Sequence, residues 1–258
     1  QWSYALFDAG SWAYASVTTG TLVPILFVKR LAEGVPTDVN IPIPNKNIPD
    51  IDMQVPNASG LWVFMVAIST LIAGLVCPIL GAIVDKFNIR KATTYAFSFA
   101  TIVFLTGFAF TSSTTLWTTV LIVTGIGMAC TSIAHCFYNS LLVLISEESD
   151  ITKVACLQNG VGAVASAVLL TLLGLQNEEN AELGESFVIT SFLVAGVWFI
   201  LFSIPMWYFL HEPEHEEGDD GTFLETLEQS WLSTLRTMKN TEMMKFLVGL
   251  LLVNDAAS

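Results

Sequence analysis

Six apolar stretches in this chain are each long enough to cross a lipid bilayer. They contain 19 to 30 residues, and a helix needs about 20 apolar residues to span a hydrocarbon core about 30 Å thick. A seventh stretch begins at Phe246 and reaches Ser258 before it is long enough, so we expect a truncated seventh span. The six predicted spans are Tyr4–Val28, Leu61–Val84, Ala92–Phe110, Leu116–Ile145, Val154–Leu175 and Phe187–Leu210.

The length and evenness of these stretches predict helices rather than strands. Strands are about 4–8 residues long, and membrane barrel strands alternate apolar and polar residues, which these stretches do not do. In lipid every backbone amide needs a partner inside the protein, and a helix supplies it within one segment. Charged residues make up 13% of the chain, about half the usual ~25% of soluble domains. The predicted fold class is an all-α membrane bundle.

The basic residues predict how this bundle sits in the membrane. If the N-terminus is cytoplasmic, seven Lys and Arg residues lie in inner loops and three in outer loops. Cytoplasmic loops are rich in Lys and Arg, so this orientation is favoured. We therefore expect a multi-pass protein of the plasma membrane or a vacuolar-type membrane, depending on the host. The net charge of −13 argues against a nucleic-acid partner.

The chain divides into three predicted parts. Residues 1–210 form the six-span bundle, residues 211–245 a cytoplasmic central loop, and residues 246–258 the start of span seven. Within the loop, Thr222 and Glu225 match a capping box at a helix start. Apolar residues then recur at every fourth position, which predicts an amphipathic helix on the inner membrane surface. We interpret it as a linker between two halves rather than a regulatory element.

The chain gives no sign of a metal site or a cofactor. Four cysteines lie inside apolar stretches without paired spacing, and they are interpreted as small buried hydrophobic residues: Cys77, Cys130, Cys136 and Cys156. A nucleotide-binding Gly-rich loop is also absent from the sequence. Energy for any transport would therefore come from an ion gradient, with protons as the candidate coupling ion, or from the gradient of the solute itself.

A charged loop after the second stretch carries the sharpest local signal. Asp85 lies at the cytoplasmic end of a predicted helix, where the helix dipole disfavours an acid. Three nearby basic residues can offset that cost. Asn88 suits a tight left-handed turn. The loop resembles the signature of the major facilitator superfamily, Gly-x-x-x-Asp-(Arg/Lys)-x-Gly-x-(Arg/Lys)-(Arg/Lys), but has Asn88 where the family has Gly. The resemblance implies a gating loop, or latch, formed by Gly81, Asp85, Lys86, Asn88, Arg90 and Lys91.

Three further segments resemble the vacuole-effluxer-like branch of that superfamily. The first span matches its opening motif at Asp8, Ala13, Tyr14 and Ala15. Phe137–Leu142 resembles its Phe-Tyr-Asn-Ala-Leu-Leu motif, and Val253-Asn254-Asp255 resembles its Tyr-Asn-Asp motif. The resemblance implies a twelve-helix transporter, of which this chain is the N-terminal half, and the efflux of amino acids or similar small solutes.

An internal repeat supports the same two-half organisation. Asp8-Ala9-Gly10-Ser11 in span one recurs as Asp255-Ala256-Ala257-Ser258 in span seven. In parallel repeats these two spans are equivalent, so both acids would border one central pathway. An acid inside a span costs about 3 kcal/mol, which makes it a functional candidate. The alternative is that Asp8 lies in the membrane interface.

Polar residues in spans one, four and five complete the candidate site. Asp8, Ser11, Ala15 and Thr19 share one helical face, which we expect to line a cavity. His135 could relay protons or touch the solute, although such a histidine more often bonds between helices. The candidate substrate or ion-coupling residues are Asp8, Ser11, Tyr14, His135, Tyr138, Asn139, Gln158, Asn159, Asn254 and Asp255.

Secondary transport by alternating access is therefore the leading interpretation of the sequence. Two rivals stay open at this point. A membrane-embedded enzyme would need a clustered catalytic set, whereas His135, His211 and His215 are scattered along the chain. A receptor or scaffold on the same fold would look the same in sequence and would differ only in lacking solute flux.

Overall fold

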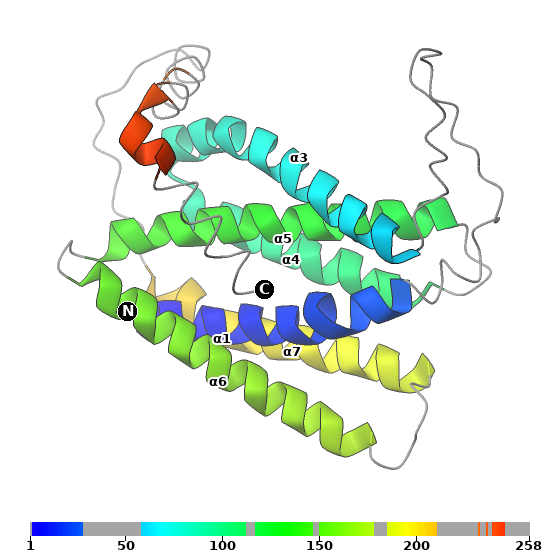
Figure 1. Cartoon of the computed structure of the whole chain (residues 1–258). Coiled ribbons are helices and arrows are strands. Elements are labelled where there is room, and N and C mark those ends of the chain that lie inside the picture. The colour runs from blue at the N-terminus through cyan, green and yellow to red at the C-terminus, as the bar shows by residue number, and fades with distance from the viewer. Residues whose placement is uncertain are drawn as a thin grey trace, which may run out of the picture.

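A computed structural model describes residues 2–27, 58–111, 117–146, 150–177 and 185–210, with residues 232, 236 and 239–245 beyond them. The regular elements within these ranges are helices (Figure 1). Their bounds are α1 Trp2–Val17, η1 Thr18–Leu22, α3 Ala58–Phe87, α4 Arg90–Ala109, α5 Trp117–Ile145, α6 Ile151–Asn177 and α7 Glu185–Phe209. Each predicted span therefore coincides with a long helix.

Five of these helices, α3 to α7, are long and apolar enough to cross a membrane. Their outward faces carry large apolar side chains, such as Val63 on α3, Val164 on α6 and Phe209 on α7, each about two-thirds or more exposed. A soluble protein rarely exposes so much apolar surface. The bundle is therefore built to be solvated by lipid.

The first predicted span is helical from Trp2 to Phe27 but contains a π-helical turn, η1. The turn coincides with a run of threonines around Gly20 that bond to the helix backbone. Thr21 Oγ1 donates to the Ser16 carbonyl five residues back at 2.8 Å, and Thr18 Oγ1 donates to the Tyr14 carbonyl at 2.7 Å. Such hydroxyls bond the backbone in place of the regular ladder and bend helices, and π turns often mark functional positions.

The helix contacts follow a repeated pattern. Helix α3 packs on α5, as α6 packs on α1, and α4 packs on α5, as α7 packs on α1. Helices α4 and α7 also contact each other. Exchanging α1 with α5, α3 with α6 and α4 with α7 leaves this set of contacts unchanged.

Helix α1 runs through the middle of the bundle, between α4 and α5 on one side and α6 and α7 on the other (Figure 1). Small residues allow this close packing. A Cβ added to Gly10 would come within 3.1 Å of the carbonyl oxygen and the ring of Phe199 on α7. The aromatic core continues around Tyr4, Phe7 and Tyr14, which are almost fully buried.

A reciprocal tyrosine pair joins α1 to α5. The Tyr4 hydroxyl donates to the Tyr138 carbonyl at 3.1 Å, and the Tyr138 hydroxyl donates to the Tyr4 carbonyl at 2.9 Å. Their rings stack with centroids 4.3 Å apart, and Phe7 stacks on Tyr138 at 4.8 Å. Both hydroxyls are therefore satisfied without water. The stacked rings close the space between α1 and α5 near the start of α1.

The interpretation of the four cysteines as buried residues is correct for Cys130 and wrong for the others, since Cys77 is half-buried and Cys136 and Cys156 are exposed. The predicted central-loop helix lies outside the described residues except for Leu232, Arg236 and Lys239, which are helical and exposed.

Candidate functional site

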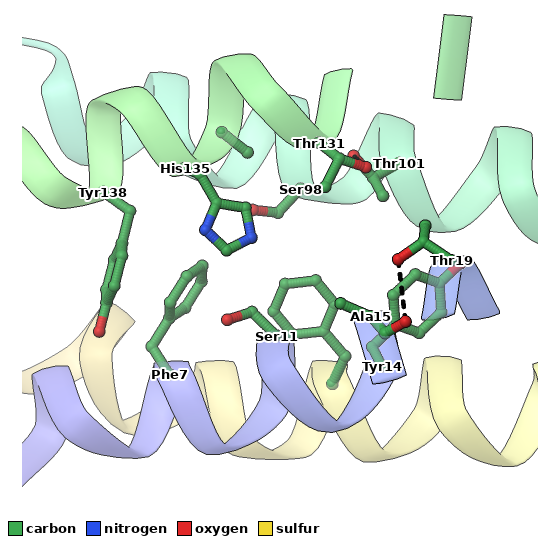
Figure 2. Close-up of a pocket in the computed structure, with 12 residues that line it drawn as sticks. Phe7, Ser11, Tyr14, Ala15, Thr19, Ser98, Thr101, Thr131, His135 and Tyr138 are labelled. Atoms are coloured by element: carbon green, nitrogen blue, oxygen red, sulfur yellow. Dashed lines mark hydrogen bonds between the residues drawn. The ribbon is translucent and has the colours of Figure 1, made fainter. Parts of the chain in front are cut away.

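A small cavity lies between α1, α4, α5 and α7. Its volume is about 20 Å³, which is room for about one water molecule. In this conformation the site is closed to anything larger. The cavity is lined by Phe7, Ser11, Tyr14, Ala15, Thr19, Ser98, Thr101, Thr131, Ala134, His135, Tyr138 and Phe199 (Figure 2).

The cavity lies near the middle of the bundle. Ser11 lies nine residues from the start of α1, Ser98 eight from the start of α4, and His135 ten from the end of α5. At 1.5 Å per residue these positions are about 12–15 Å from the same end of the bundle. That depth is about half of a 30 Å hydrocarbon core.

Two cavity-lining residues, Ser98 and Tyr14, have a buried hydroxyl without a hydrogen-bond partner among the described residues. Most Ser and Thr side chains in these helices donate to a carbonyl one turn back, as Thr101 does to Phe97 at 2.9 Å and Thr131 does to Gly127 at 2.9 Å. Ser98 is 5% exposed, and its Oγ has no such bond. A buried hydroxyl left unpaired costs about 1–3 kcal/mol. Ser98 is therefore placed to bind whatever enters the cavity.

His135 and Ser11 face each other across the same cavity. His135 descends from α5 between Phe7 and Ser98, and Ser11 rises from α1 beneath it (Figure 2). The Ser11 hydroxyl also contacts the Asp8 carboxylate, with 3.4 Å between Ser11 Oγ and Asp8 Oδ1. Ser11 thus connects the cavity to the acid.

Asp8 itself lies outside the cavity. This corrects the prediction that the whole helical face shared by Asp8, Ser11, Ala15 and Thr19 lines it. Ser11, Ala15 and Thr19 do line the cavity, but the Asp8 carboxylate is turned toward α6. A Cβ on Gly162 would lie 3.1 Å from Asp8 Oδ2. Asp8 is 1% exposed, and Oδ2 has no hydrogen-bond partner. Within the described helices it is the single acid away from a helix end.

The other predicted site residues do not lie together in the structure. Tyr14 and Tyr138 line the cavity. Gln158 is buried on α6 and its Oε1 is unpaired, whereas Asn139 and Asn159 are exposed. The predicted residues Asn254 and Asp255 lie outside the described residues. Six lining residues were not predicted, because their role follows from packing: Phe7, Ser98, Thr101, Thr131, Ala134 and Phe199.

Gly162 offers a direct test of how tightly α6 holds Asp8. Gly162→Ala is expected to destabilise the bundle by about 1–3 kcal/mol, because its Cβ would meet both Asp8 Oδ2 and Trp12 Cγ at 3.1 Å. Gly160→Ala is the matched control, since a Cβ there meets open space on the same helix. Unfolding of both variants in detergent measures the difference. Equal stability would show that Asp8 and α6 are not in close contact.

The loop between α3 and α4 has the turn that its sequence predicted. Asn88 has φ 48°, and the Ile89 amide donates to the Val84 carbonyl at 3.1 Å. This bond across a left-handed residue is a Schellman-type helix ending. Asp85 then accepts two bonds from Arg90, at 2.9 Å from Nε and 2.7 Å from Nη2. The negative charge of Asp85 is therefore balanced by Arg90 within the loop.

Lys91 has a different role from its neighbour Arg90. Its Nζ donates to the Trp207 carbonyl at 3.0 Å and to the Leu210 carbonyl at 2.7 Å, and it lies 5.2 Å from the centre of the Trp207 ring. Lys91 therefore caps the C-terminal end of α7, where a cation also interacts favourably with the helix dipole. Tyr95 on the next turn of α4 donates to the Ser203 carbonyl at 2.6 Å. The loop is thus fastened to the last helix of the bundle.

Removing this cap is expected to loosen the end of α7. Lys91→Met should destabilise the bundle by about 1–2 kcal/mol, since two carbonyl bonds and a favourable dipole interaction are lost. Lys153→Met is the matched control, because Lys153 forms an exposed pair with Asp150. Hydrogen exchange at residues 205–210 locates the effect. Unaltered exchange there in Lys91→Met would contradict the capping role.

The apolar outer faces, the six long helices and their repeated contacts define an integral membrane protein of the transporter type. Six-helix halves built from two three-helix repeats are typical of major facilitator transporters, and the exchange pattern of α1, α3 and α4 with α5, α6 and α7 has this form. The cavity lies between α1 and α5, which are the first helices of the two repeats.

The chain belongs to the family described as vacuole effluxer Atg22 like, whose model matches residues 1–155 and 144–258. This is a family of transporters and not of enzymes. The chain is also 24% identical over 215 residues to a protein of Bacillus subtilis (strain 168) named "Uncharacterized MFS-type transporter YxiO". That match covers 81% of this chain and 46% of the relative, so the chain spans about half the length of the curated relative. No solved structure matches the chain.

Proposed function

We propose that this chain is the N-terminal six-helix half of a twelve-helix secondary active transporter that moves amino acids or similarly small solutes by alternating access. Two six-helix halves would rock around a site near the middle of the membrane. Span seven would begin the second half, and residues 211–245 would link the two in the cytoplasm. Protons are the proposed coupling ion.

The observation that carries this proposal is the unpaired hydroxyl of Ser98 in the cavity. A purely structural core would satisfy a hydroxyl that is 95% buried, either with a helix carbonyl or by replacing it with an apolar residue. Here Ser98, His135 and Ser11 instead border a space that is about one water in size. These groups are placed to bind a ligand that is present for part of the transport cycle.

The charges near the cavity favour a proton or an amine over an anion. Among the described cavity-lining residues none is Lys or Arg, the usual partners of a carboxylate or phosphate. Asp8 instead lies one hydrogen bond behind the cavity, through Ser11. An acid is suited to hold a proton or an ammonium group. The repeat of the Asp8–Ser11 sequence at residues 255–258 supports a second acid on the other half.

The loop at residues 81–91 is proposed to hold one conformation of the transport cycle. Asp85 and Arg90 stiffen the turn between α3 and α4, and Lys91 connects this turn to α7. Because α7 leads into the central loop, the connection could pass movement of the loop to the second half. The latch function implied by the sequence is thus proposed to act through Lys91 as well as through Asp85.

Solute exchange in proteoliposomes tests this function. The full-length protein is expected to exchange labelled amino acids across the membrane faster than protein-free liposomes. Ser98→Leu, which fills the cavity, should reduce exchange at least about tenfold, whereas Thr171→Leu on the exposed face of α6 should not. Binding of solute without any flux would contradict the transporter and favour a receptor on the same fold.

A further inference from the structure

A groove lies on the surface of the bundle between α4 and α7. Its volume is about 320 Å³, within the usual ~300–1,000 Å³ of small-molecule sites. Large apolar side chains line it, among them Phe99, Ile204 and Tyr208, which are 63%, 45% and 71% exposed. In Figure 1 the two helices lie behind α5 and α1, on one face of the bundle. Because both are apolar enough to cross a membrane, the groove is a site for an apolar ligand at membrane depth.

The groove extends along about half the thickness of a membrane. On α7 it runs from Phe199 to Tyr208, and on α4 it runs from Tyr95 to Ile102. Nine residues of helix correspond to about 14 Å, which is close to half of a ~30 Å hydrocarbon core. The groove therefore has the depth of the acyl chains in one leaflet of a bilayer.

Aromatic side chains and a cation mark one end of the groove. Tyr95 and Trp207 meet there edge to face, with ring centroids 4.9 Å apart, and Tyr208 also lines this end. Trp and Tyr are enriched where a membrane meets water, so this end lies at the level of the lipid headgroups. The Nζ of Lys91 lies 5.2 Å from the centre of the Trp207 ring. A cation is therefore present where a headgroup would be.

The turn that carries Lys91 is positively charged. Residues 85–91 contain one acid and three bases, a formal charge of +2, and the acid, Asp85, is paired with Arg90. The bonds from Lys91 to two carbonyls of α7 hold its charge at the end of the groove. A lysine attracts phosphate as a point charge, and basic pockets between membrane helices bind anionic headgroups. The charge of this end is therefore complementary to a lipid phosphate.

We propose that the groove between α4 and α7 binds an anionic phospholipid, with one acyl chain along the groove and the phosphate beside Lys91. Two hydroxyls line the groove, and that of Ser203 is already bonded to the Phe199 carbonyl at 2.7 Å. The walls are otherwise apolar or aromatic, which suits a hydrocarbon chain. An uncharged lipid would fill the groove without using the cation, whereas an anionic phospholipid uses both.

The groove shares part of its wall with the central cavity. Ser98 and Phe199 line both spaces, and both residues are almost fully buried. An acyl chain in the groove would therefore pack against side chains that border the cavity and would support them in one arrangement. This consequence rests on the proposed transport function, whereas lipid binding itself does not.

Photo-crosslinking in liposomes tests the site directly. The full-length protein is reconstituted with phosphatidylglycerol that carries a photoreactive diazirine on one acyl chain, or with phosphatidylcholine that carries the same chain. Peptides containing residues 95–102 and 199–208 are expected to be labelled at least about threefold more strongly by phosphatidylglycerol. Equal labelling by the two lipids would overturn the anionic headgroup contact. Labelling spread evenly over all the spans would overturn the groove.

Two variants separate the headgroup contact from the groove. Lys91→Met should remove the preference for phosphatidylglycerol, whereas Lys153→Met, at an exposed pair with Asp150, should keep it. Ile204→Trp fills the groove and should lower labelling there by both lipids. Ile122→Trp, at an isoleucine of α5 that is 61% exposed, is its matched control.

The two variants also guard against a purely structural effect. Because Lys91 caps α7, its loss could loosen that helix, but Ile204→Trp leaves the cap in place. Unchanged labelling in Ile204→Trp would overturn the site. A preference for phosphatidylglycerol that survives in Lys91→Met would overturn the role of Lys91.

Flux measurements separate this inference from the proposed function. Solute exchange is expected to be at least about threefold faster in liposomes that contain phosphatidylglycerol than in phosphatidylcholine alone, and Ile204→Trp should remove the difference. Labelling of the groove with exchange that is the same in both lipids would overturn the link to the cavity. Absence of exchange in both lipids would instead contradict the transporter, while the labelled peptides would still establish the lipid site.

Discussion

Replacing Asp8 by asparagine is expected to abolish uptake driven by a pH gradient while the protein still folds and inserts. Asparagine has nearly the same shape, but it cannot take up and release a proton. The carboxylate is 1% exposed, and one of its oxygens is unpaired, so an amide fits the site without leaving a buried charge. Gradient-driven flux in proteoliposomes should fall to the level of protein-free vesicles.

Exchange at equal pH distinguishes two roles for Asp8. If the acid carries the coupling proton, Asp8→Asn should still exchange solute between equal solutions, since no proton needs to move. If it binds a solute amine, exchange should be lost as well. Asp150→Asn is the matched control, because Asp150 is an acid near a helix end that pairs with Lys153. Wild-type gradient-driven flux in Asp8→Asn would remove the residue from the site.

Tyr138→Ala is expected to be the most destabilising single change among the cavity residues. The substitution removes a buried ring that stacks on Tyr4 and Phe7, and it removes the hydroxyl that bonds the Tyr4 carbonyl. Truncating a buried aromatic residue costs about 3–5 kcal/mol. The loss adjoins an existing cavity, so the surrounding side chains cannot easily close the space.

Two comparisons make this prediction specific. Tyr138→Phe keeps the stacked ring and loses one hydrogen bond, so it should cost only about 1 kcal/mol. Tyr208→Ala removes a tyrosine that is 71% exposed and should have little effect. Unfolding of the three variants by a denaturing detergent measures their order. A similar loss in Tyr138→Ala and Tyr208→Ala would contradict the role of the tyrosine pair in closing the bundle.

The helices could be predicted from the sequence because lipid imposes a simple requirement. A segment must be apolar and about 20 residues long to cross a bilayer, so the predicted span Phe187–Leu210 and the observed α7, Glu185–Phe209, nearly coincide. The left-handed turn at Asn88 was also predictable, since few residue types tolerate that conformation. The π-helical turn in the first span was not, because it depends on hydroxyl bonds to the backbone.

The site could be predicted only in part, because its residues face different ways on their helices. Adjacent helical residues differ in direction by about 100°, so Tyr138 lines the cavity whereas the neighbouring Asn139 is exposed. The same rotation separates buried Gln158 from exposed Asn159. Ser98 resembles many other Ser and Thr residues in sequence. Its lack of a partner is a result of how α4 packs against α1 and α5.

Thiol labelling at position 11 tests the central claim, that the cavity beside Asp8 opens alternately to the two sides of the membrane. Ser11→Cys is made in the full-length protein with its native cysteines replaced, and a membrane-impermeant reagent is applied from either face. Solute is expected to raise labelling from one face and to lower it from the other. Labelling that is absent from both faces, or unchanged by solute, while Asp150→Cys reacts, would contradict the claim.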